Sequence, residues 1–152
     1  MGDEHDLRAI ARAIIDANLY MVLGTADEAG RPWVSPVYYA MTAYREFFWV
    51  SSPEATHSRN LDARPEVSIV VFDSAVPIST GQAVYMSASA RELVGAERAE
   101  AIEVYSRRTL EHGGAAWTLE DVQSPGRLRL YRATAADHYV LDEHDRRVPV
   151  TL

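Results

Sequence analysis

The sequence contains no cysteine and no lysine, because all fifteen of its basic residues are arginine. The absence of cysteine excludes disulfides, a thiolate nucleophile, a cysteine-based zinc site and an iron–sulfur cluster. The absence of lysine excludes Schiff-base chemistry and a P-loop lysine. Any phosphate bound by this chain must therefore be held by arginine, hydroxyl groups, histidine or backbone amides.

Long apolar runs are also missing, since none approaches the roughly 20 residues that a membrane-spanning helix needs. Residues 1–6 are acidic and have no apolar core, so we expect no secretory signal and a cytoplasmic protein. The net charge of −7 argues against nucleic acid or an anionic membrane as a main partner. A chain of 152 residues that is 47% hydrophobic and 24% charged predicts one globular domain over 1–152.

Hydrophobic periodicity predicts a mainly β chain with peripheral helices. Apolar positions at helical spacing favour an N-terminal helix in 1–17 and a main helix over 96–111, and a short helix is expected over 55–63. The strands are expected at 19–25, 31–41, 47–51, 66–73, 82–93, 128–133 with a continuation at 139–141 after a break, and 148–151. Pro36 places its strand at an edge or a bulge. With no βαβ rhythm, this order predicts an antiparallel barrel of six to seven strands in the α+β class.

The most informative segment runs from Trp49 to Pro65, where a strand end, a Ser-Ser-Pro turn and the short helix follow one another. The helix opens with Thr56, His57, Ser58 and Arg59. A helix N-terminus carries unpaired amides and a partial positive charge, and hydroxyls with a guanidinium suit it to a phosphate. The alternative is that these residues only cap and solvate the helix. His57 either adds charge to such a site or is an exposed first-turn residue.

No metal site is predicted. The remaining histidines lack ligand spacing such as a pair at i and i+4 on one helix. A set formed by His138 and His144 with nearby aspartates is possible in principle, but acidic-polar loops are usually only solvated. The sequence also shows no catalytic triad or acid–base dyad, so the catalytic residues and the substrate stay unknown.

Several short motifs, in this order and at this spacing, resemble the pyridoxamine 5′-phosphate oxidase-like flavin-binding split-barrel superfamily over roughly residues 10–140. The motifs are Gly24-Thr25, Gly30-Arg31-Pro32, Ser35-Pro36-Val37, Ser51-Ser52-Pro53, His57-Ser58-Arg59-Asn60-Leu61, Pro65 and Val67-Ser68-Ile69.

The resemblance implies a split β-barrel homodimer that binds flavin mononucleotide (FMN) between its subunits and transfers hydride to or from a small organic substrate. It implies backbone contacts to the cofactor ring from the strand of Val37, Tyr38 and Tyr39. The implied phosphate-site residues are Ser51, Ser52, Ser58 and Arg59, with His57 beside them. Gln82 is implied to reach the cofactor, and Trp117, with the segment 105–108, to approach the ring from the partner subunit.

The chain also departs from the family oxidases. Where they carry lysine, at the end of the second strand and at the short helix, this sequence has Tyr39 or Ala40 and His57. Their substrate-binding Arg-His pair has no counterpart, since Arg146-Arg147 lacks the accompanying motif. The chain is therefore closer to the short members of the superfamily. Two alternatives stay open: a reductase that uses a deazaflavin coenzyme, and a non-catalytic protein that binds flavin or haem.

Overall fold

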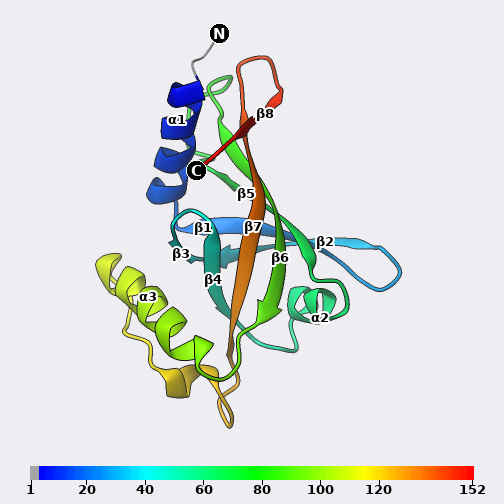
Figure 1. The fold of residues 1–152 in the computed structure, drawn as a ribbon, viewed down its shortest axis with the longest axis vertical. Coiled ribbons are helices and arrows are strands. Elements are labelled where there is room, and N and C mark those ends of the chain that lie inside the picture. Colours follow the sequence, from blue (N-terminus) through cyan, green and yellow to red (C-terminus); the bar gives the residue numbers. More distant parts are fainter. Residues whose placement is uncertain (1–3) are drawn as a thin grey trace.

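The computed structural model describes residues 4–152 as an antiparallel sheet that curls into a split barrel with helices packed around it (Figure 1). The helices are α1 (Glu4–Ala17), α2 (Thr56–Ala63), α3 (Glu97–Glu111) and the 3₁₀ helix η1 (Leu119–Val122). The strands are β1 (Tyr20–Ala26), β2 (Pro32–Tyr38), β3 (Ala40–Thr42), β4 (Glu46–Ser51), β5 (Glu66–Phe72), β6 (Ala83–Glu92), β7 (Arg129–Leu141) and β8 (Arg147–Val150). The predicted fold class and the predicted helices are confirmed; the part of the expected N-terminal helix at residues 1–3 lies outside the described residues.

The strands run in the order β2-β1-β5-β6-β7-β4-β3, and β8 pairs with β7 beside this path. Every pairing is antiparallel. The end strands β2 and β3 are consecutive in the chain and are separated only by Tyr39, so the sheet closes on itself. This connection makes a barrel that is split between β2 and β3.

The sheet has eight strands: seven lie along the barrel path, within the expected six to seven, and β8 pairs with β7 beside that path. The expected strand 31–41 breaks at Tyr39 into β2 and β3, since this residue takes the chain from one edge of the sheet to the other. The strand expected at 128–133 and its continuation at 139–141 form one unbroken strand, β7, so the expected break is wrong. A bulge in β7 explains the apparent gap, because the register with β6 shifts between Ser87 and Ala88 and leaves Ala136 unpaired.

Two hydrophobic clusters hold the barrel together. Trp49 and Phe47 of β4 point into the barrel and belong to the same hydrophobic cluster as Ala11 and Ile15 of α1. Phe48, between them in the sequence, points to the other face and packs under α3. Because both faces of β4 are covered, its central residues form a continuous aromatic run rather than an alternating one.

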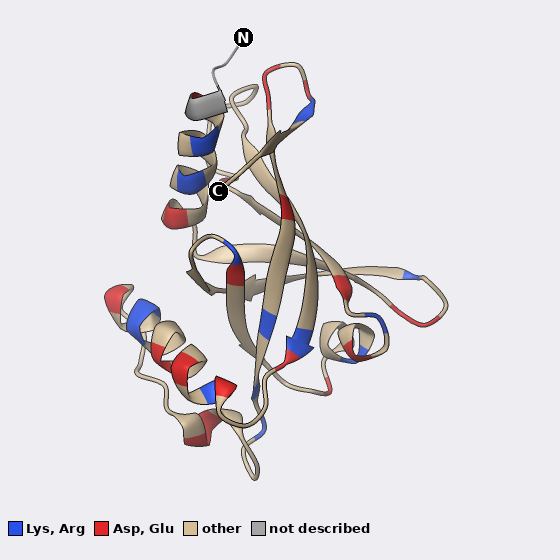
Figure 2. Cartoon of the chain, in the orientation of Figure 1, with Lys and Arg blue, Asp and Glu red and all other residues tan. Residues whose placement is uncertain are grey.

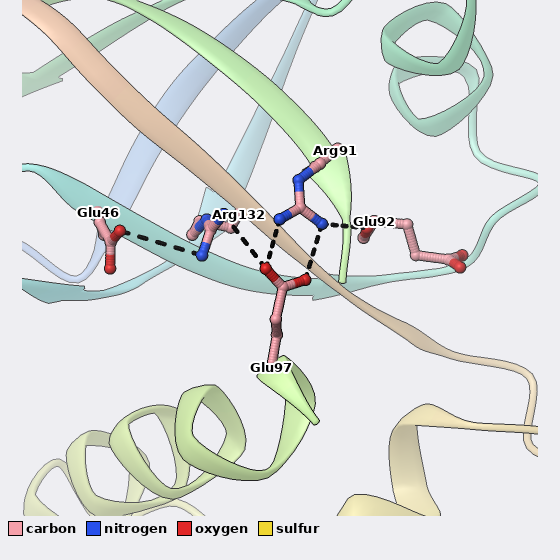
Figure 3. Close-up of polar contacts among 5 residues, drawn as sticks. All are labelled: Glu46, Arg91, Glu92, Glu97 and Arg132. Atoms are coloured by element: carbon pink, nitrogen blue, oxygen red, sulfur yellow. Dashed lines mark hydrogen bonds and ion pairs between the residues drawn. The ribbon is translucent and has the colours of Figure 1, made fainter. Parts of the chain in front are cut away.

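An ion network holds the first turn of α3 against the barrel (Figure 3). Arg91 at the end of β6 donates two hydrogen bonds to Glu97, at 2.9 and 2.6 Å. Arg132 of β7 lies 3.8 Å from Glu97 and 4.0 Å from Glu46. The charged residues of the described chain lie mostly on α1, α3 and the turns, and the strands are largely uncharged (Figure 2).

Candidate functional site

The predicted anion site lies where β4 ends and α2 begins. The residue before α2 is Ala55, which has no side-chain acceptor to cap the helix. In the part of the chain that the structure describes, the amides of Thr56, His57 and Ser58 therefore find no acceptor. An uncapped helix start leaves these donors available to an anion.

Hydrogen bonds join the two serines at the end of β4 to the first turn of α2. The Nε2 atom of His57 lies 2.9 Å from the Ser51 hydroxyl, and the Ser58 hydroxyl donates to the Ser52 carbonyl at 2.8 Å. The Ser52 hydroxyl accepts the Glu54 amide at 3.2 Å, which leaves its own proton free for donation. Four of the predicted phosphate-site residues thus form one cluster, in which the Ser58 hydroxyl already has a structural partner.

His57 is buried, so the interpretation of it as an exposed first-turn residue is wrong. Burial lowers its pKa below the ordinary value of 6.5, because desolvation disfavours the imidazolium. His57 is therefore neutral near pH 7 in the free protein, and it orients Ser51 rather than adding a charge. Arg59, by contrast, is exposed, and its guanidinium has no hydrogen bond or ion pair within residues 4–152.

A buried amide that the sequence interpretation did not assign to the site fixes α2 against the rest of the sheet. Asn60 donates from Nδ2 to the Thr25 hydroxyl of β1 at 3.1 Å, and both residues are buried. Both belong to the short motifs noted in the sequence, which is the signal that was available for them. This bond holds α2 beside the hairpin of β1 and β2. The α2 cluster and strand β2, which are the two predicted parts of the cofactor site, therefore lie close together.

Strand β2 is an edge strand, as Pro36 predicted. The Tyr39 amide donates to the Leu19 carbonyl, and the Asp27 amide to the Arg31 carbonyl. The odd-numbered residues of β2 therefore direct their backbone groups toward β1, and the even-numbered ones direct theirs outward. Pro32 and Pro36 are even-numbered and lack an amide, so within β2 only Val34 and Tyr38 present amides to the open edge.

The side chains of Val37, Tyr38 and Tyr39 do not share one environment. Val37 and Tyr39 are buried in the barrel, and the Tyr39 hydroxyl donates to the Ile15 carbonyl. Burial raises the pKa of Tyr39 to about 12. The backbone groups of Val37 and Tyr39 point toward β1, so of the three residues only Tyr38 presents its amide to the open edge.

The remaining predicted residues lie elsewhere in the subunit. Trp117 packs edge-to-face on Tyr105 at 5.6 Å, and Tyr105 packs on Tyr38 at 5.5 Å, so these rings form a group under α3. Gln82 comes just before β6, at the opposite end of that strand from Ala90, whose amide bonds the Pro65 carbonyl just after α2. At about 3.3 Å per residue, one subunit cannot bring Gln82 to α2.

The outer face of the sheet carries a hollow of about 660 Å³ beside the β1–β2 hairpin. Small side chains from four strands form its floor: Gly24, Ser68, Ser87, Ser89, Thr134 and Ala136. Trp33 and Val34 of β2 stand at its side and are 50% and 68% exposed. The hollow is broad and largely apolar, and Glu66 is the one charged residue in its lining.

The cluster at α2 fits a phosphate group. Its donors outnumber its acceptors, since the first-turn amides, the Ser52 hydroxyl proton and Arg59 have no acceptor in the described chain. The indole Nε1 of the buried Trp49, two residues before Ser51 on β4, likewise has no acceptor there. Within residues 4–152, no group of three or more metal-ligating side chains is found, and no helix is long and apolar enough to cross a membrane.

Comparison with known proteins agrees with this fold. Residues 7–143 match the family model described as pyridoxamine 5′-phosphate oxidase. The fold is similar to HutZ, the heme storage protein from Vibrio cholerae, with a TM-score of 0.70 and 22% identity over 88% of this chain and 94% of that one.

Two further solved structures share the fold. A heme binding protein from Mycobacterium smegmatis has a TM-score of 0.71 and 19% identity, over 92% of this chain and 55% of that one. An F420 reductase has a TM-score of 0.63 and 15% identity, over 84% of this chain and 94% of that one. No curated protein sequence matches the chain. Identities this low show the fold alone.

Proposed function

Because the chain belongs to the pyridoxamine 5′-phosphate oxidase family, we propose that it is an oxidoreductase that binds FMN and transfers hydride to or from a small organic substrate. The observation that supports this most directly is the uncapped start of α2, with unpaired donors next to Ser51 and Ser52. The site lies beside an edge strand whose outward backbone groups are free for a planar ring.

A bound flavin would supply the hydride chemistry, and the protein supplies position and electrostatics. The first-turn amides of α2, the Ser52 hydroxyl and Arg59 would hold the phosphate. The outward amides of Val34 and Tyr38 would donate hydrogen bonds to polar atoms of the ring. Backbone donors of this kind cost no reorganisation when negative charge develops beside them.

We propose that the working unit is a homodimer formed through the outer face of the sheet. The hollow beside β2 is lined mainly by small side chains, with Glu66 as its one charged residue, and Trp33 and Val34 at its side are exposed apolar side chains. Exposed apolar surface of this kind marks an interaction surface. Within one subunit, Gln82 and Trp117 lie away from the α2 cluster. In the proposed dimer, these two residues of the second subunit would contact the cofactor held at α2 of the first.

Sedimentation velocity tests the dimer. We expect a dimer for the unaltered chain and a monomer for Val34→Glu, because a carboxylate at a buried interface would lose its hydration. Glu28→Gln, at the exposed β1–β2 turn, is the control and should leave the dimer intact. A monomer for the unaltered chain contradicts the proposal. A cytoplasmic location belongs to the same proposal and is tested by cell fractionation.

Reconstitution tests the cofactor. The purified protein is mixed in turn with FMN, with the deazaflavin coenzyme F420 and with haem, desalted, and examined by absorption spectroscopy. Retention of about one FMN per chain supports the proposal, and hydride transfer is then tested by anaerobic reduction and a substrate screen. Retention of F420 alone identifies a deazaflavin-dependent reductase of the same fold.

Arg59→Ala is expected to weaken FMN binding about tenfold to 150-fold, because a hydrogen bond to a charged group contributes about 1.5–3 kcal/mol. Arg8→Ala on the exposed face of α1 removes the same charge far from the site and should leave the affinity unchanged. An unchanged dissociation constant for Arg59→Ala would remove this residue from the site.

Haem binding without catalysis is the second candidate function. It is favoured by the similarity in fold to two solved structures described as heme proteins. A Soret band with no retained flavin would support it. No retained chromophore of any kind would contradict both candidates.

A further inference from the structure

Arg129, the first residue of β7, lies beside the α2 cluster, although it is far from it in the sequence. In the pairing of β4 with β7, Arg129 is directly opposite Ser51. Directly opposite residues of an antiparallel pair share one face, with Cβ atoms about 4.5–5.5 Å apart. The next pair on that face, Trp49 and Tyr131, stacks at 5.8 Å with an interplanar angle of 13°. Arg129 therefore leaves the sheet next to the hydroxyl that contacts His57.

The Arg129 guanidinium is half-buried and has only neutral partners. Its Nη1 donates to the Gly126 and Leu128 carbonyls at 2.6 and 2.7 Å, and its Nη2 donates to the Ser124 hydroxyl at 3.1 Å. In residues 4–152, no carboxylate lies within ion-pair distance of it.

Arg132, three residues further along β7, shows the contrast, because it is equally half-buried but is paired with two glutamates (Figure 3). Asp62 and Glu92 lie in the neighbourhood of Tyr131, yet neither pairs with Arg129. A partly desolvated cation without a counter-ion is unfavourable unless an anion completes it.

Independent features of the same region also lack a partner. The buried indole N–H of Trp49, on the face of β4 that carries Ser51, has no acceptor in the described chain. The connection from β4 to α2 and the loop before β7 lie at the same end of the sheet (Figure 1). A half-buried cation and an uncapped helix start thus lie at the same end of the sheet.

We propose that Arg129 is a further binding residue for the phosphate group held at the start of α2. The guanidinium would exchange its neutral carbonyl partners for phosphate oxygens, and hydrogen bonds between charged groups are about twice as strong as neutral ones. The chain has no lysine and His57 is neutral, so Arg59 is the one cation so far assigned to the proposed site. Arg129 would supply a second cation from β7. This inference rests on the proposed function for the identity of the ligand, but not for the presence of an anion.

The first test compares FMN with riboflavin, which has the same ring but no phosphate. Arg129→Gln is expected to weaken FMN binding about tenfold to 150-fold and to change riboflavin binding less than twofold. Arg129→Lys, which keeps the charge, should recover part of the affinity. Arg127→Gln, at an exposed position two residues earlier, is the matched control. Equal losses for both ligands would indicate a structural role only and would overturn the inference, as would no loss for either.

The second test does not depend on a flavin. Inorganic phosphate is titrated into the ¹⁵N-labelled protein, and the amide shifts of Thr56, His57 and Ser58 are followed. Saturable shifts support the inference if the phosphate affinity that they report is at least fivefold weaker in Arg129→Gln. This result would stand even if FMN fails to bind and the proposed function is wrong. Shifts that are absent in the unaltered protein, or equal in the variant, overturn it. Thermal unfolding of each variant verifies that the fold is retained.

Discussion

The β3–β4 turn contains two non-glycine residues in the left-handed region, and this leads to a stability prediction of defined sign. Ala43 and Tyr44 have φ values of 54° and 55°. The left-handed conformation costs an L-residue roughly 1–2 kcal/mol, because Cβ approaches the following carbonyl oxygen. Glycine avoids this cost but loses more backbone entropy on folding, by roughly 0.5–1 kcal/mol. Ala43 is exposed, so its methyl group contributes little packing. Ala43→Gly should therefore stabilise the fold by about 0.5–1 kcal/mol.

Tyr44 has the same strain but different compensation. Its hydroxyl donates to Asp16 of α1 at 2.9 Å, and the Arg12 guanidinium lies 5.3 Å from its ring centre. His138 adds a hydrogen bond of 2.6 Å to the Tyr44 carbonyl from β7. Tyr44→Gly would release the strain but lose the side-chain contacts, so we expect no net gain from it.

Urea unfolding followed by circular dichroism measures both variants at one protein concentration, because association would otherwise shift the midpoint. Ala13→Gly is the control: it lies at an exposed interior position of α1, where glycine should cost about 1 kcal/mol. The two alanine-to-glycine changes are thus expected to have opposite signs. A destabilisation by Ala43→Gly equal to that of the control would refute the assignment of strain to the turn.

Three further predictions follow from the site and its supports. Ser58→Ala should destabilise the fold by about 0.5–1.5 kcal/mol, because the hydrogen bond from the buried Ser58 hydroxyl to the Ser52 carbonyl is lost while that carbonyl keeps the Ala55 amide as a donor; no measurable change in urea unfolding would contradict this. The pKa of His57 is lowered by burial, so the unfolded chain takes up the proton first and stability falls as pH drops from about 6.5 through the folded-state pKa. His57→Gln should reduce that loss between pH 7.5 and 5.5, and an identical pH profile would argue against it. The pKa of Glu97 is lowered chiefly by its hydrogen bonds from Arg91, so this contribution is present above about pH 4.5 and is lost as pH falls through the folded-state pKa. In hydrogen exchange, the first turn of α3 should become less protected over that range, whereas Glu97→Gln should show the weaker protection throughout.

Local patterns in the sequence predicted the elements well where a single face was buried. The helical spacing of Leu7, Ile10 and Ile14 predicted α1, and the turn at Gly30 placed the β1–β2 hairpin. The patterns failed where burial was not one-sided. The polar residues Asp137 and His138 interrupt the apolar pattern of β7. In the structure, Asp137 accepts a hydrogen bond from the Ser87 hydroxyl and His138 is hydrogen-bonded to the Tyr44 carbonyl, so the strand continues through both.

The candidate site was predicted in part. Residues 51–59 form a cluster because they are close in the chain. Their closeness in space therefore does not depend on a correct prediction of the strand order. The buried state of His57 could not be predicted, because it depends on how α2 packs against β1, β2 and β6. The importance of Asn60 and Thr25 depends likewise on a contact across 35 residues.

By itself, the sequence determined the chemistry available to this protein: no thiol, no amine side chain, and a helix start with hydroxyls and an arginine after a strand. It also determined the family, through short motifs whose order and spacing are local properties. Only the tertiary structure decided which residues meet. It set Arg129 opposite Ser51, placed Gln82 at the far end of β6 from α2, and turned two prolines of β2 toward an open edge. The physical reason is that strand register and sheet order arise from packing between distant segments, and a shift of one residue in register reverses which side chains share a face.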